Sequence, residues 1–279
     1  MAAYPATYED SIGLCQTVMR RARQVSARQP RIEWRVPIRG VVFAGPLESL
    51  QAQVVPDERL DPSVAAPRDG TTSSNYSPAG LRRVGDRYEA VGAEGRQTGL
   101  VLLDDNDGVP TPPADGWPPI PTRRFGGHDS SLFFELREGT LTFVLPVDVL
   151  RRSSSREAEL TVSVDLATER ARLRLSLDGE VTESAFHHHL EGAIPGVEGA
   201  LGEPVKLHCC FNCSMSDYFH GGTGLSGMFC FRDSRQAYRS VRSKADYVRL
   251  VPDAITEFVD ELYVCREFEQ RQPGTGYRG

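Results

Sequence analysis

The sequence contains almost no lysine and no long apolar run. Of its 279 residues, 32 are Lys or Arg, and the only lysines are Lys206 and Lys244. The 38 acidic residues leave a net charge of −6, which argues against a general nucleic-acid or anionic-membrane binder. No run approaches the ~18 apolar residues that a membrane-spanning helix needs. The first ten residues also lack a basic stretch followed by an apolar one, so we expect a cytoplasmic protein without membrane association.

Motifs for nucleotide chemistry are also missing. The glycine-rich stretch 221–224 is not followed by Gly-Lys-Ser/Thr, so it does not form a phosphate-binding loop of that type. Asp217, Tyr218 and His220 precede these glycines and supply a carboxylate, a phenol and an imidazole. They lie too close in sequence to define a catalytic geometry. A metal-dependent hydrolase that uses the 216–224 loop is therefore the alternative hypothesis, and a non-enzymatic protein is the leading one.

The N-terminal two thirds of the chain reads as β-structure. Apolar and polar residues alternate over 160–166 and again over 171–177, with a short polar connection between them, which predicts a hairpin with one buried face. The same period over 32–38 and 141–145 predicts further strands. Helical spacing of apolar residues favours helices over 11–25, 190–201, 233–241 and, most strongly, 253–264. Ser243 and Asp246 have the spacing of a capping box before another helix.

These patterns predict an α+β protein with two parts. The first is a β-rich domain over 1–189, an antiparallel sheet or sandwich, with long loops at 56–98 and 104–128 where Pro, Gly, Ser and Asp gather. The second is a smaller C-terminal α/β lobe over 190–279, packed on the first. A lobe of this size lacks a large core of its own, and a metal would stabilise it.

Cysteines are concentrated in that lobe. Cys210 and Cys213 form a Cys-x2-Cys knuckle, Cys230 follows after 16 residues, and Cys265 after another 34. A structural Zn²⁺ site takes four S or N ligands in a tetrahedron, and a cytoplasmic protein keeps its thiols reduced. We therefore expect a Zn²⁺ ion that joins the knuckle, a strand and a helix end.

Two neighbouring residues leave the ligand set open. Cys209 with Cys213 would make a Cys-x3-Cys pair, which zinc sites also permit, although adjacent residues of an extended segment point in opposite directions. On that ground Cys209 is the better candidate for a packed thiol. His208 could replace one thiolate, or instead lie beside the metal ligands. Buried reduced thiols without a metal are the alternative to a zinc site.

The C-terminal motifs resemble an uncharacterised bacterial domain-of-unknown-function family. The likeness lies in Cys210-Phe-Asn-Cys213, in Cys230-Phe-Arg232, in Cys265, and in the final Gly-Thr-Gly-Tyr-Arg-Gly. It implies bacterial origin and selects Cys210, Cys213, Cys230 and Cys265 as the metal ligands. It implies no reaction.

Three functions remain to be separated. Arg235, Arg239 and Arg242 share one helical face and could bind phosphate or nucleic acid, although a solvated face paired with local carboxylates is the simpler interpretation. The enzyme hypothesis depends on the 216–224 loop. Neither the arginine face nor the loop contains a recognisable set of binding or catalytic residues. We therefore expect a protein–protein interaction module of the immunity or assembly type, with an unknown protein partner and Zn²⁺ as its cofactor.

Overall fold

A computed structural model describes the chain in segments. These segments are residues 2–10, 13–25, 30–38, 41–45, 51–55, 78–84, 87–92, 95–101, 120–126, 132–136, 138–151, 154–201, 205–218 and 227–272. All six cysteines fall within them and form no disulfide. No helix in these segments is long and apolar enough to cross a membrane.

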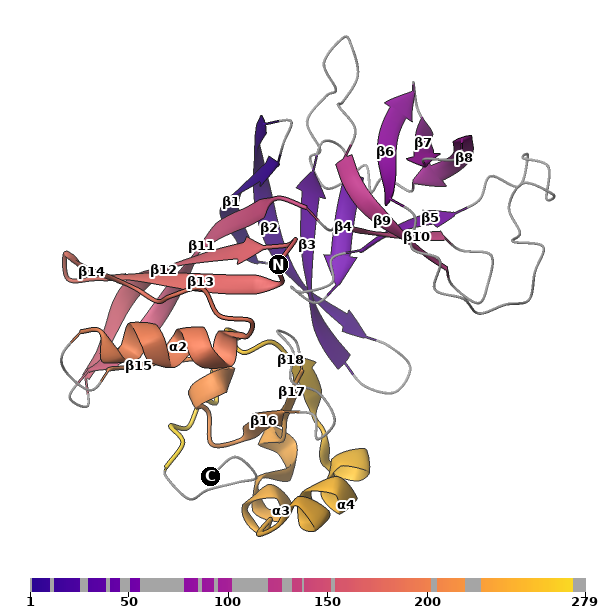
Figure 1. The fold of residues 1–279 in the computed structure, drawn as a ribbon. Helices are drawn as coiled ribbons and strands as arrows, with labels where there is room; N and C mark the ends of the chain where they lie inside the picture. Colours follow the sequence, from indigo (N-terminus) through magenta and orange to yellow (C-terminus); the bar gives the residue numbers. More distant parts are fainter. Residues whose placement is uncertain are drawn as a thin grey trace.

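The described elements are mostly strands (Figure 1). In the first half of the chain they are β1 Ala2–Asp10, β2 Gly13–Val25, β3 Pro30–Ile38, β4 Val41–Gly45, β5 Gln51–Val55, β6 Pro78–Val84, β7 Arg87–Gly92, β8 Gly95–Val101, β9 Ile120–Gly126 and β10 Leu132–Leu136. In the second half they are β11 Thr140–Arg151, β12 Ser154–Asp165, β13 Arg170–Leu177, β14 Glu180–Glu183, α2 Leu190–Gly199, β15 Val205–Leu207, η2 Cys210–Asn212, β16 Ser216–Tyr218, β17 Met228–Cys230, η3 Arg232–Ser234, α3 Arg235–Arg239, α4 Lys244–Ala254 and β18 Glu257–Val259. A strand-rich protein with an antiparallel sheet and few helices is the β-rich α+β fold that the sequence predicts.

The main sheet is built around β11. This strand pairs antiparallel with β12 along its whole length, and on its other edge with β1 first and β15 last. From β12 the sheet continues to β13 and β14, and from β1 to β2 and β3. The hairpin predicted over 160–177 is confirmed, since Leu160 faces Leu175 and Val162 faces Leu173.

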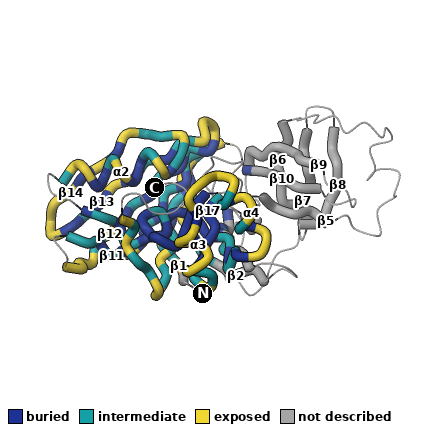
Figure 2. The backbone as a smooth tube through the Cα atoms, turned by 90° about the horizontal axis from the view of Figure 1, so that it is seen from below, coloured by how far each residue is buried: buried dark blue, intermediate teal, exposed yellow. Residues whose placement is uncertain are grey.

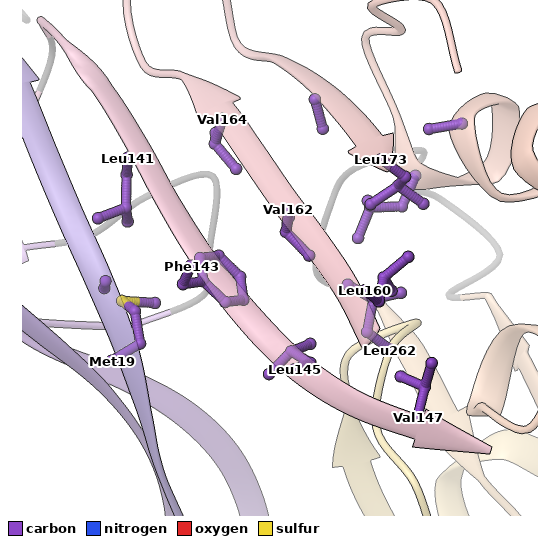
Figure 3. Close-up of a cluster of buried hydrophobic side chains, with 14 of the residues drawn as sticks. Met19, Leu141, Phe143, Leu145, Val147, Leu160, Val162, Val164, Leu173 and Leu262 are labelled. Atoms are coloured by element: carbon purple, nitrogen blue, oxygen red, sulfur yellow. The ribbon is translucent and has the colours of Figure 1, made fainter. Parts of the chain in front are cut away.

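Alternate residues of these strands form the main core. The buried positions of β11 are Leu141, Phe143, Leu145, Val147 and Val149, each at most 5% exposed. Figure 3 shows four of these side chains on the same face as Leu160, Val162 and Val164 of β12. A period of two places the intervening Thr, Ser, Asp and Arg residues on the other face.

The helix α2 and the strand β15 belong to this core and not to the C-terminal lobe. The helix contacts β13, β14 and β15, and its Leu190, Ala193, Ile194 and Val197 are buried in the main cluster. Packing therefore divides near Cys209 instead of at the boundary of 189 and 190 that the sequence suggests. The reason is that α2 supplies the apolar cover that one face of a half-buried sheet requires.

Two stretches predicted as long loops contain strands. Three strands, β6, β7 and β8, lie within 56–98 or reach just past its end, and β9 lies within 104–128. They pair with one another and with β5 and β10. The reason is that β6, β7 and β8 are joined by two-residue connections, of which Gly85-Asp86 is a Gly-X hairpin signal that composition alone hides. Residues 56–77 and 102–119 lie outside the described segments.

The helix predicted over 11–25 is wrong. Residues 13–25 form β2, which pairs with β1 on one edge and β3 on the other. Met19, fully buried, faces the main core in company with the half-buried Cys15. Hydrogen bonds along both edges of the segment outweigh its intrinsic helical preference.

The C-terminal lobe contains a small antiparallel sheet, β16–β17–β18, and the helices α3 and α4. Phe229, Phe231, Tyr238 and Tyr247 form the centre of its own core. The capping prediction is confirmed, because the Ser243 hydroxyl accepts a hydrogen bond from the backbone N–H of Asp246 at the start of α4. In Figure 2 the outer surfaces of α3 and α4 are exposed, while β17 lies inside.

The helix predicted over 253–264 is also wrong. The preceding helix α4 already ends at Ala254, and residues 257–259 form β18. The Ile255 backbone is extended, and the Thr256 N–H donates to the Cys230 carbonyl at 2.8 Å. Pairing of β18 with β17 supplies the backbone partners that a continuing helix would supply, and the apolar residues then divide between the faces of a strand.

Candidate metal centre

The cysteine knuckle is the meeting point of the C-terminal segments. The Cys210 N–H donates to the Tyr263 carbonyl and the Phe211 N–H to the Glu261 carbonyl, both at 2.9 Å. On its other side Cys213 forms a β-bridge with Gln270. The chain from 261 to 270 therefore passes along both ends of the knuckle, and Cys265 lies within that passage.

Cys230 is brought to the knuckle by the small sheet. It ends β17 and pairs with Ser216 of β16, three residues after Cys213. Cys210 and Cys230 belong to one buried cluster, and they are each 3% exposed. The structure thus gathers all four predicted ligands, Cys210, Cys213, Cys230 and Cys265, into one lobe, although the sequence separates them by up to 55 positions.

Burial and nearby sulfurs raise the pKa values of two of the four cysteines. Burial raises the pKa of Cys230 to about 11 despite the opposing effect of Arg232. The sulfurs of Cys265 and Cys213 add to that rise. Burial also raises the pKa of Cys210 well above its ordinary value, followed by contributions from Cys230 and Cys213.

Two of the sulfurs accept hydrogen bonds from the backbone. The Met215 N–H donates to Cys213 Sγ at 3.4 Å, and the Glu267 N–H donates to Cys265 Sγ at 3.2 Å. In both cases the donor is the second residue after the cysteine. These N–H groups fix the direction of each sulfur relative to its own turn.

The side chains do not form a closed site as they stand. Among the described residues, no three His, Cys, Asp or Glu side chains are arranged to hold a metal ion. Backbone pairing brings the segments that carry the four cysteines together, but their side chains do not form a metal site in the described structure. A change of χ1 rotamer moves a cysteine sulfur without moving the backbone, so side-chain rotation is one movement that ligation requires.

Cys209 and His208 make contacts outside the group of four candidate ligands. Cys209 is 1% exposed and packs into the main core, while Cys210 joins Cys230, as the alternation of an extended segment predicts. Burial raises the pKa of Cys209 to about 12, which keeps it an inert thiol. The His208 ring packs against Phe268 in a tilted arrangement with ring centroids 4.0 Å apart, and its Nδ1 lies 3.9 Å from an Asp148 carboxylate oxygen.

Asn212 and Glu198 anchor the knuckle to the sheet. The Asn212 side-chain amide donates to Glu198 Oε1 at 2.6 Å and to the Leu207 carbonyl at 2.8 Å. Glu198, in the last turn of α2, also accepts from the Lys206 ammonium and the Leu207 N–H. Sequence reasoning missed both residues. The position of Asn212 inside the knuckle is a signal for one of them, whereas Glu198 carries none.

Arg21 is a second link between lobe and sheet. Its guanidinium lies 4.3 Å from the Trp34 ring centroid and 5.5 Å from that of Tyr263. It also donates to Asp260 Oδ1 and to the Leu262 carbonyl, both at 3.4 Å. The chain that carries Cys265 is therefore held against β2 shortly before it reaches the cysteine.

The residues of the enzyme hypothesis are engaged in the interior. Asp217 is fully buried, accepts a hydrogen bond from the Tyr238 hydroxyl at 2.5 Å, and lies 3.9 Å from the Arg271 guanidinium. The Ser216 hydroxyl donates to the Cys210 carbonyl. These side chains hold the lobe together and face away from solvent. Residues 219–226, which include His220 and the glycines, lie outside the described segments.

Two of the three arginines of the predicted face are paired with carboxylates. Arg235 forms an ion pair with Glu267, and Arg239 binds both oxygens of Glu269 at 2.7 Å. Arg242 donates to the Arg239 and Val241 carbonyls. Arg271 lies 3.9 Å from the Asp217 carboxylate and donates to the Ser216 carbonyl.

Comparison with known proteins finds no relative: no protein-family model, no curated protein and no solved structure matches the chain. The resemblance to an uncharacterised bacterial family, carried by the cysteine motifs, therefore stays a prediction.

Proposed function

We propose that the C-terminal lobe binds one structural Zn²⁺ through Cys210, Cys213, Cys230 and Cys265, and that the protein works as a binding module for a partner protein. The observation that carries the proposal is the convergence of these four cysteines. Backbone pairing of the knuckle with 261–270 and of β16 with β17 brings together residues that are far apart in sequence.

The chemistry of the four residues fits Zn²⁺. Four thiolates at ~2.3 Å form a closed tetrahedral site with no position left for a substrate. The N–H groups aimed at Cys213 and Cys265 are the outer interactions that orient and stabilise such ligands. The zinc would join the knuckle, β17 and the C-terminal segment, and so add to the stability that the small core of the lobe provides.

A binding role is favoured over catalysis because Asp217, Arg235 and Arg239, which are candidate groups within the described segments, already have partners. Asp217 holds Tyr238 in the interior, and Arg235 and Arg239 are neutralised by glutamates. A structural zinc site demands no catalytic constellation, and neither does a partner-binding sheet.

Metal analysis and X-ray absorption of protein purified without added metal test the proposal. We expect about one zinc per chain with four sulfur neighbours at ~2.3 Å. An oxygen neighbour in place of a sulfur would favour the hydrolase. Metal-free folded protein whose thiols all react freely would exclude the zinc site.

A further inference from the structure

We propose that Asn212 and Glu198 are positioning residues for the metal: together they hold the Cys210–Cys213 knuckle in its ligand-binding shape on the main core. The inference rests on the proposed function, since it requires both cysteines to be ligands. It goes further by assigning part of the metal affinity to Asn212 and to the side-chain oxygen of residue 198 that Asn212 binds, neither of which is a metal ligand.

Asn212 is fixed at both its side chain and its backbone. Its amide nitrogen divides its two hydrogens between Glu198 and the Leu207 carbonyl. Its backbone N–H donates to the Cys209 carbonyl at 3.0 Å, and its carbonyl accepts from the Arg271 N–H at 2.8 Å. Because Asn212 lies between the two cysteines of the knuckle and is only 7% exposed, fixing it fixes the turn that presents both thiols.

Glu198 occupies a position that would be unfavourable without this role. A negative charge in the last turn of a helix opposes the helix dipole, and burying a carboxylate is costly unless its oxygens are hydrogen-bonded. Glu198 is 3% exposed, yet it accepts from three donors: the Asn212 amide, the Leu207 N–H at 2.9 Å and the Lys206 ammonium at 2.6 Å. These bonds connect α2, β15 and the knuckle through one side chain.

The contacts that hold the two knuckle cysteines differ from those that hold the other two candidate ligands. The knuckle is tied to the main core through the hydrogen bonds of Asn212 to Glu198 and to the Leu207 carbonyl. Cys230 is held instead by strand pairing within the small sheet, and Cys265 follows the segment that Arg21 contacts. A preformed pair of ligands lowers the ordering cost of binding the ion. Loss of an interaction that orients ligands costs 10–100-fold in metal affinity in general.

The test compares Zn²⁺ affinity, by competition with a chromophoric chelator, and the absorption spectrum of bound Co²⁺. The variants are Asn212→Ala, Glu198→Gln and the matched control Val162→Ala, which removes two methyl groups from the main core away from the knuckle. Glu198→Gln keeps an oxygen that accepts from Asn212 and Leu207, so it is the conservative rescue. Asn212→Ser, whose side chain is too short to reach Glu198, replaces the alanine variant if that does not fold.

We expect Asn212→Ala to bind Zn²⁺ about 10–100-fold more weakly and to change the Co²⁺ spectrum. Glu198→Gln and Val162→Ala should stay within about threefold of the wild type, although Val162→Ala lowers the melting temperature. Equal affinity in Asn212→Ala and Val162→Ala would show that Asn212 is merely structural and overturn this inference alone. A wild-type protein that binds no Zn²⁺ would overturn the proposed function as well.

Discussion

Substitution of Arg21 by alanine should weaken the attachment of the C-terminal lobe to the sheet and lower the stability of the protein. The Arg21 and Asp260 side chains are 9% and 8% exposed, so their ion pair is almost completely shielded from water. Removing the cation leaves the Asp260 carboxylate buried without it, and breaking a buried pair in this way costs about 3–5 kcal/mol. For a chain of this size, about 3 kcal/mol corresponds to a fall of roughly 6–12 °C in melting temperature.

The assay is thermal unfolding followed by circular dichroism. Arg174→Ala is the matched control, because Arg174 lies on the exposed face of β13. Adding Asp260→Asn to Arg21→Ala should recover part of the loss, since the double variant buries no charge at this position. If Arg21→Ala melts together with Arg174→Ala, or if Asp260→Asn recovers nothing, the lobe is not held by this pair.

The same pair sets a pH dependence with a defined sign. Burial raises the pKa of Asp260 above 3.8, its ordinary value, and Arg21 opposes that rise. A carboxyl whose folded pKa is raised loses stability as pH rises through the window between the unfolded and folded values. Without Arg21 the window widens, so the stability deficit of Arg21→Ala should be smaller at pH 5 than at pH 7.5. A deficit that grows on acidification would refute this reasoning.

Two further predictions concern α2 and the metal. A Cβ on Gly192 would lie 2.6 Å from His187 Nδ1, whereas one on Gly199 meets nothing within 4 Å. In a thermal scan Gly192→Ala should therefore lose about 1–3 kcal/mol and Gly199→Ala nothing, and equal melting would contradict this packing. Because the raised pKa values of Cys210 and Cys230 keep both thiols protonated at pH 7, zinc uptake should release at least two protons per ion. A weakly buffered titration with a pH indicator that finds fewer than two would contradict the assigned ligands.

The sequence predicts strands well where one face is buried. Leu160, Val162, Leu173 and Leu175 alternate with polar residues because β12 and β13 face the core on one side only, and this period is visible without a structure. The helix predicted from the apolar spacing over 253–264 is wrong because the apolar residues of this segment pack into two different cores. Ala254 ends a helix and packs in the lobe core, whereas Leu262 packs in the main core.

The four cysteines of the candidate site are predicted from their spacing together with the family resemblance, but the residues that surround them are not. Glu198 is one acidic residue among 38, and only the pairing of β15 with β11 brings α2 within reach of the knuckle. Arg21 likewise contacts a segment 239 positions away. Contacts between residues so far apart in sequence depend on the fold as a whole, so no local sequence pattern predicts them.

The most direct test of the zinc site is the metal content and thermal stability of the wild type beside Cys213→Ser. We expect about one Zn²⁺ per chain in the wild type, loss of the ion in the variant, and a lower melting temperature that chelation reproduces in the wild type. Cys209→Ser is the matched control, since Cys209 packs in the main core and should leave the zinc in place. Wild-type protein that folds fully without metal, and melts at the same temperature with and without a chelator, would contradict the account.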